Sequence, residues 1–280
     1  MTPFHAWREG LRRVLSAPSV LVAVWVLTTL VAVPRTLAIR DEIAGNLGRA
    51  LASDAAPRGM TDEWMQESAG HGTGLAATVR PTIMGFAGVL PWVFLSGGII
   101  DRYMRNRATG TRGFSAACGA CFFRLLRLAI ITAIVDGLLF GALHPWLFSR
   151  LYVRLVFLLC LAAVNIVFDF AEVRAVVEDR RSMVLALVAS WRFIRSNPAK
   201  AIGVYLLNAV LFGLVLGAYS YLAPTGGNGV RVLAAVMIGH VYLFGRLCVR
   251  LLFFASETAL VMATLTGSPY VRDARTASTM

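Results

Sequence analysis

Apolar and polar positions alternate along the 280-residue chain as long apolar stretches separated by shorter polar, basic segments. A helix needs about 20 apolar residues to cross a hydrocarbon core about 30 Å thick. Six stretches reach that length and predict spans near 18–39, 81–100, 125–147, 151–175, 199–222 and 231–265. The pattern therefore predicts an all-α, polytopic transmembrane helical bundle that forms one membrane domain over residues 1–280.

The sixth stretch is longer than one upright crossing requires. Its 35 residues would extend about 52 Å as a continuous helix. The helix either tilts and protrudes into the cytoplasm or breaks near Gly245, and the pattern leaves both possibilities open.

Basic residues are distributed unevenly between the connecting segments. Segments 1–18, 101–127, 172–200 and 266–280 carry 3, 6, 6 and 2 Lys or Arg residues, whereas segments 40–80, 144–154 and 223–231 carry 4, 2 and 1. Because Lys and Arg accumulate on the cytoplasmic side, both termini and the loops 101–124 and 176–198 are expected there. The acidic outer loop 40–80 is expected to form a short helix and a mobile turn outside the membrane.

The composition supports a membrane protein and changes how the positive net charge is interpreted. The chain is 58% apolar and only 15% charged, with a formal net charge of +12. The Arg residues lie in short loops between apolar stretches, so they indicate topology and not a nucleic-acid interface. Every basic residue except Lys200 is Arg, which is typical of a GC-rich bacterial genome, so we expect a bacterial inner-membrane protein.

Three cytoplasmic segments that precede the odd-numbered spans resemble one another. They are "RRVLSAP" at 12–18, "RLLRLAI" at 124–130 and "RFIRSNP" at 192–198. Pro18 aligns with Pro198 at the first turn of a span, where proline removes no helical hydrogen bond. The similarity predicts three repeated helical hairpins, each preceded by a cytoplasmic amphipathic helix at the headgroup boundary.

The N-terminal segment also has features of a secretory signal. Basic residues precede the apolar run "VLVAVWVLTTLVAV", and "TLA" at 36–38 would permit cleavage after Ala38. Because the segment belongs to the repeat, we favour an uncleaved anchor.

A family resemblance is carried by "VVEDRRSMVLALVASWRFIRSNPAKAIGVYLLN" at 176–208. With its acidic-Arg turn, amphipathic segment and Asn-Pro, it resembles the loop-plus-span unit of uncharacterised bacterial six-helix membrane proteins. These are similar to the membrane region attached to some glycerophosphodiester phosphodiesterases. The resemblance covers mainly residues 165–210. It implies a six-helix fold and brings no catalytic residues.

Asp136 is the most unusual residue of the third span, because it lies near the middle of an apolar run, 128–148. A charge at that depth costs about 3 kcal/mol or more unless it is paired, protonated or exposed to water. The sixth span offers His240, Arg246 and Arg250 as partners. The simplest hypothesis is an interhelical ion-pair network; the alternatives are a proton or substrate site, and Arg side chains that extend to the interface.

Further polar residues of the fourth, fifth and sixth spans extend this possible network. Asn165, Asp169 and Glu172 follow one another at i, i+4 and i+7, on one helix face, and Glu257 lies on nearly the same face as Arg246 and Arg250. Asn208 is expected to bond to Asn165. These groups either join helices through hydrogen bonds or line a polar cavity.

Metal, cofactor and catalytic motifs are not evident. "CGAC" at 118–121 has CxxC spacing but lacks two further zinc ligands, so close packing is the better interpretation. We therefore expect no enzyme, no metal and no cofactor. The favoured function is a membrane subunit or scaffold that binds other membrane or cytoplasmic subunits in an envelope or transport system. The alternatives are a small-molecule or ion permease and a lipid-acting enzyme with Asp101, Asp169 and Glu172 at its site.

Overall fold

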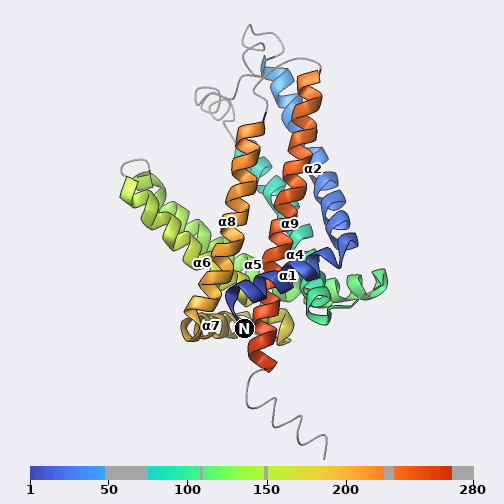
Figure 1. Cartoon of the computed structure of the whole chain (residues 1–280). Coiled ribbons are helices and arrows are strands. Elements are labelled where there is room, and N and C mark those ends of the chain that lie inside the picture. The colour runs from blue at the N-terminus through green and yellow to red at the C-terminus, as the bar shows by residue number, and fades with distance from the viewer. Residues whose placement is uncertain (48–74, 108–109, 148–150, 224–229, 267–280) are drawn as a thin grey trace, which may run out of the picture. The chain divides into compact units, whose positions relative to one another are not determined.

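The computed structural model describes residues 1–47, 75–107, 110–147, 151–223 and 230–266, and every regular element within these ranges is an α-helix (Figure 1). The helices are α1 (Pro3–Leu15), α2 (Pro18–Leu47), α4 (Leu75–Arg105), α5 (Thr111–Leu147), α6 (Leu151–Val177), α7 (Met183–Ser196), α8 (Pro198–Leu222) and α9 (Val230–Thr266). The predicted all-α class is confirmed. The helix and turn predicted for the outer loop fall mainly on 48–74, outside the described residues.

Each of the six predicted spans falls within one long helix. Among the described residues, four helices are long and apolar enough to cross a membrane, namely Thr111–Gly141, Tyr152–Val177, Pro198–Leu222 and Leu233–Leu265. The pair formed by Pro3–Leu15 and Pro18–Pro34, bent by 75°, provides a fifth if it is taken as one span. These long apolar helices agree with a multi-pass membrane protein, while the number of six crossings stays a prediction.

Helix α9 continues through Gly245 without a break, so the break considered for the sixth stretch is not formed. A glycine inside a helix costs about 1 kcal/mol relative to alanine, which is not enough to break α9 here. A Cβ atom at Gly245 would lie 3.3 Å from a methyl carbon of Val215 in α8. The missing side chain therefore allows α8 and α9 to approach closely.

Of the predicted surface segments, the first and third form separate helices and the second does not. Helix α1 ends before Pro18 and α7 ends before Pro198, so each proline begins the next helix. The second segment is continuous with the span, because α5 runs unbroken from Thr111 to Leu147. The reason is local: position 130, which aligns with Pro18, is Ile, which does not end a helix.

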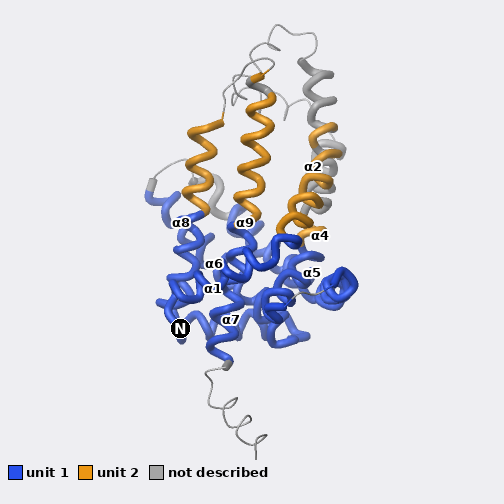
Figure 2. The backbone as a smooth tube through the Cα atoms, turned by 45° about the vertical axis from the view of Figure 1, so that its right-hand side comes forward, with its two compact units in different colours: residues 1–20, 93–211, 249–280 blue, residues 21–92, 212–248 orange. Residues whose placement is uncertain are grey.

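The chain divides into two compact units (Figure 2). Unit 1 comprises residues 1–20, 93–211 and 249–280, and unit 2 comprises residues 21–92 and 212–248. In unit 1, α9 is the innermost helix, since every residue from Leu251 to Val261 except Phe253 is buried. Phe170 and Val173 of α6 and Val204 of α8 are also fully buried.

Small residues allow three helix contacts within unit 1. A Cβ atom on Gly10 of α1 would lie 2.7 Å from the Cα of Ser256 in α9. A Cβ atom on Gly97 of α4 would lie 2.6 Å from the Cβ of Cys121 in α5, and one on Gly98 would meet the sulfur of Cys118. In the third contact, the Ser190 hydroxyl of α7 donates a hydrogen bond of 2.8 Å to the carbonyl of Val167 in α6. Both cysteines are buried and free, as the close-packing interpretation of "CGAC" expects.

Helix α1 is attached to α4 by Arg13. Its guanidinium donates a hydrogen bond of 2.8 Å to the carbonyl oxygen of Tyr103 in the last turn of α4, and a second of 3.0 Å to the Glu9 carboxylate. Arg12 also bonds to Glu9. Burial by itself raises the pKa of Glu9, but the hydrogen bonds and positive charges of Arg13 and Arg12 outweigh it and hold that pKa below its ordinary value.

The contact at Gly10 leads to a test of close packing. We expect Gly10→Ala to lower the stability of the protein by about 1–2 kcal/mol, because the methyl group overlaps the backbone of Ser256 and overpacking outweighs the gain in helix propensity. Thermal unfolding in mild detergent measures the effect. Gly119→Ala is the matched control, since no atom lies within 4 Å of its added methyl group. Equal stability changes in the two variants would contradict the contact.

Candidate functional site

A cluster of charged side chains lies between α6 and α9 in unit 1. Arg250 of α9 places its Nη1 atom 3.6 Å from the Oδ1 atom of Asp169 in α6, and its guanidinium lies 5.1 Å from the centre of the Phe254 ring. Its positive charge also acts on Glu172 and Glu257. We call Asp169, Glu172, Arg250 and Glu257 the acidic cluster.

The members of the acidic cluster differ in exposure and in partners. The side chain of Arg250 keeps 40% of its surface exposed and that of Asp169 keeps 14%, whereas Glu257 is fully buried. The Ser96 hydroxyl on α4 lies near Glu172 and donates its hydrogen bond, 3.1 Å long, to the carbonyl of Val93. Within the part of the chain that the structure describes, neither carboxylate oxygen of Glu257 has a hydrogen-bond partner.

The charges of this cluster are unbalanced. Three carboxylates face one guanidinium, so ionisation of all three would leave two excess negative charges. A buried carboxylate without hydrogen bonds is costly in its charged form, and Glu257 is the member in that position. The arrangement is therefore suited to holding helices together through Arg250 and Asp169, and to taking up positive charge near Glu257.

A neutral hydrogen-bonded pair lies next to the acidic cluster. The side-chain amide nitrogen of Asn208 on α8 donates to the hydroxyl oxygen of Ser256 at 2.9 Å, and that hydroxyl donates to the carbonyl of Leu252 at 2.7 Å. Asn208 and Ser256 are both fully buried. The bond expected from Asn208 to Asn165 is not formed: the prediction was wrong because Asn208 meets α9.

Asp136 of α5 is not part of the acidic cluster. The candidate partner in its own unit, Arg250, pairs with Asp169 instead, and Asp136 forms no ion pair among the described residues. Asp136 is half-buried, and its Oδ1 atom is buried without a hydrogen-bond partner. Of the three candidate partners of Asp136, Arg250 is thus engaged with Asp169.

The remaining predicted residues lie elsewhere. In unit 2, the ring of His240 lies 6.2 Å from that of Trp25, and its Nδ1 atom is 2.9 Å from the carbonyl oxygen of Val236. Arg246, also in unit 2, is exposed. Asn165 is half-buried on α6. The predicted network thus reduces to Asp169, Glu172, Arg250 and Glu257, with Asn208 beside them.

Three residues of this region were not predicted from the sequence. Ser256 bonds to Asn208, Ser96 lies near Glu172, and Tyr205 of α8 lies near the charges of Asp169, Glu257 and Arg250. The ring of Tyr205 packs against Phe253 at 5.4 Å. The only sequence signal was the position of Ser256 directly before Glu257.

The acids proposed for a lipid-acting enzyme are engaged separately. Asp101 pairs with Arg105 at 2.9 Å, one turn away on α4, whereas Asp169 pairs with Arg250. Among the residues described, no group of three or more His, Cys, Asp or Glu side chains is placed to hold a metal ion.

Comparison with protein-family models, with curated proteins and with solved structures finds no match. The resemblance of residues 176–208 therefore stays a prediction. Function has to be argued from the site itself.

The ion pair leads to a test of the cluster's cation. We expect Arg250→Gln to lower stability by about 2 kcal/mol, which is less than the roughly 3–5 kcal/mol for fully buried pairs because Arg250 is partly exposed. The loss follows because three carboxylates are left without a cation. Thermal unfolding of the purified protein measures it, with Arg246→Gln, one turn earlier on α9, as the matched control. Similar losses in both variants would argue against the cluster.

Two acid-to-amide substitutions test the charge imbalance. We expect Asp169→Asn to lower stability because it removes the carboxylate nearest the guanidinium. Glu257→Gln should leave stability unchanged or raise it, because it removes an unbonded charge and keeps the side-chain shape. Unfolding of the two variants under the same conditions makes the comparison. A loss in Glu257→Gln as large as that in Asp169→Asn would mean that its negative charge is required.

Proposed function

We propose that the chain is a non-enzymatic, multi-pass protein of the bacterial inner membrane that serves as a membrane subunit or scaffold and assembles with other subunits of an envelope or transport system. One observation carries this proposal: the polar side chains Asn208, Ser256 and Glu257 have no exposed surface. Groups that line a substrate passage need access to water, whereas these are enclosed between helices. Their arrangement is suited to holding helices together.

The proposal includes six crossings arranged as three hairpins, α2–α4, α5–α6 and α8–α9. Helices α1 and α7 support the repeat, because Ala6, Gly10 and Val14 are buried at the positions that correspond to the buried residues Ala186, Ser190 and Ile194. Both helices are followed by a proline that begins the next helix.

The small-residue contacts support a cyclic order of the three repeats. Helix α1 packs against α9, the first part of α5 against α4, and α7 against α6. Each surface segment thus contacts the second helix of the preceding hairpin, with the third preceding the first. In a closed ring of this kind, every surface segment packs against one helix of the preceding hairpin.

The proposed orientation places both termini in the cytoplasm. Its support is the excess of Lys and Arg in segments 1–18, 101–127, 172–200 and 266–280. The short helices α1 and α7 would then lie at the inner membrane surface.

The outer half of α5 is the face we assign to a partner helix. Ile134 and Leu138 are exposed there, and nothing lies within 4 Å of a Cβ atom added to Gly137 or Gly141. Glycines four residues apart allow two helices to approach closely in a membrane. Asp136 is half-buried beside Gly137, and the accessible part of its carboxylate would gain a donor from the partner.

A proton-coupled permease is the second candidate. It is favoured by the excess of carboxylates over guanidinium in the acidic cluster, which permits a proton to be bound and released near Glu257. Proton-driven flux in liposomes that contain only this protein would support it over the scaffold.

The scaffold proposal is tested by gentle purification and by two matched substitutions. Leu138→Ala on α5 should weaken association with the partner about tenfold, because it removes packing from the proposed face. Leu159→Ala on α6 removes an equally exposed leucine, 70% against 69%, and should have no effect. Quantitative mass spectrometry of the co-purified proteins measures both. Recovery of the wild-type chain as a lone monomer in mild detergent and in native lipid discs would contradict the proposal.

A further inference from the structure

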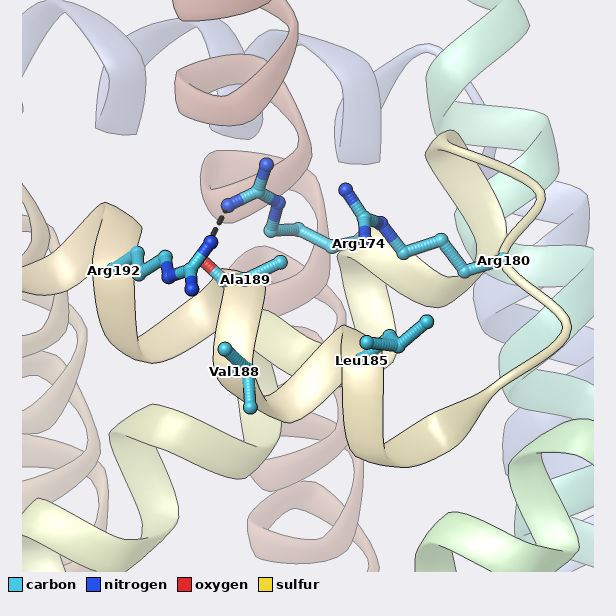
Figure 3. A pocket seen from close by; sticks show the side chains of 6 residues that line it. All are labelled: Arg174, Arg180, Leu185, Val188, Ala189 and Arg192. Carbon is cyan, nitrogen blue, oxygen red and sulfur yellow. Dashed lines mark hydrogen bonds between the residues drawn. The ribbon is translucent and has the colours of Figure 1, made fainter.

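A small pocket rich in arginine lies where α6 turns into α7 (Figure 3). It has a volume of about 250 Å³ and is lined by Arg174, Arg180, Leu185, Val188, Ala189 and Arg192. We call it the arginine pocket. All of its residues belong to unit 1, and it does not include any member of the acidic cluster.

Arg174 is held firmly in place on one side of the pocket. Its guanidinium donates to the carbonyl of Ala189 at 2.5 Å (Figure 3). It also pairs with Glu178 one turn away and lies 5.6 Å from the centre of the Phe193 ring. Its position is therefore set before any ligand arrives, which reduces the entropy lost on binding.

The turn between the helices positions the second arginine. Asp179, two residues after the end of α6, has a φ of 49°. Asp adopts this left-handed conformation more readily than most residues, and it turns the chain toward α7. The next residue, Arg180, pairs with the same Glu178 carboxylate that Arg174 uses. One carboxylate is thus shared by two guanidinium groups.

Arg192 is the third arginine, and it leaves the pocket with excess positive charge. It extends from α7 toward the pocket, as Figure 3 shows, and no carboxylate pairs with it among the described residues. Three guanidinium groups against Glu178 alone leave two net positive charges. Arginine binds phosphate oxygens through paired N–H groups, so the pocket is suited to a phosphate.

The apolar surface beside the pocket favours the phosphate of a lipid over a soluble phosphate. Val184, Leu185, Val188 and Trp191 are exposed on α7 by 63%, 58%, 40% and 55%. A soluble phosphate would leave this surface in water, whereas the acyl chains of a lipid would cover it. An exposed tryptophan beside arginines is also typical of a helix at the headgroup level.

The ends of the neighbouring helices also place the arginine pocket at the level of the lipid headgroups. The candidate span Tyr152–Val177 ends three residues after Arg174, and the candidate span Pro198–Leu222 begins six residues after Arg192. Helix α7 thus lies where two apolar helices leave the hydrocarbon region.

We propose that the arginine pocket binds the phosphate headgroup of an anionic phospholipid of the cytoplasmic leaflet, with the exposed apolar face of α7 resting on its acyl chains. This inference is independent of assembly with other subunits, because it concerns one chain and one lipid.

Native mass spectrometry of the full chain, titrated with phosphatidylglycerol or phosphatidylcholine, tests the proposal. We expect binding that prefers phosphatidylglycerol. Arg192→Gln should weaken it about tenfold, because one charge-assisted contact is lost. Arg192→Lys should retain part of it, because the charge remains.

Arg195→Gln is the matched control, since it removes the same charge from an exposed position of α7 outside the pocket. Its effect should stay within about twofold, as for a screened surface charge. Unfolding temperatures of all variants in detergent verify that they remain folded. Equal loss in Arg192→Gln and Arg195→Gln, or no preference for phosphatidylglycerol, would overturn the proposal.

Competition with inorganic phosphate separates the two sources of the anion. We expect millimolar phosphate to leave phosphatidylglycerol bound, because it cannot replace the contacts with the acyl chains. Displacement of the lipid by phosphate at comparable concentration would assign the pocket to a soluble anion and overturn the lipid proposal.

Discussion

Hydrocarbon offers no hydrogen bonds, and this constraint determines how the polar groups of the chain are arranged. A charged or amide side chain in a membrane span has to find its partners within the protein. Arg250 and Asp169 meet that requirement as an ion pair between α9 and α6, and Asn208 and Ser256 meet it as a hydrogen-bonded pair between α8 and α9. The polar residues thereby specify which helices are neighbours in unit 1.

Apolar contacts alone would not make this choice, because lipid chains solvate leucine and valine as well as a neighbouring helix does. Helices in a membrane associate where their surfaces fit closely. Gly10, Gly97 and Gly98 provide that fit, since each leaves room for an atom of the opposite helix. Close approach and polar pairing meet at Ser256, which Gly10 contacts and to which Asn208 donates, and together they define one arrangement.

The sequence predicted those features that depend on spacing along one helix. Apolar length located the long helices, and Pro18 and Pro198 marked the residues where two of them begin. Helical spacing also placed Asp169 and Glu172 on one face. The pairing of Asn208 and the roles of Ser96 and Ser256 were not predictable, because they depend on which faces of separate helices meet.

Two further features, the unbroken course of α5 and the arginine pocket, were not predicted from the sequence. Helix α5 was expected to consist of a surface segment and a span, by analogy with the other two repeats, but it has no proline at the junction. The arginine pocket was also not foreseen. Its residues were interpreted as topology signals, and only the turn after α6 brings Arg174, Arg180 and Arg192 together.

The unbroken course of α5 has a mechanical consequence. Where α1 meets α2, a corner of 75° separates the two helices. Helix α5 has no such joint and forms a stiff rod of 37 residues, about 55 Å long. A force applied to its basic N-terminal end is transmitted along the whole rod, and any tilt there changes the position of Asp136.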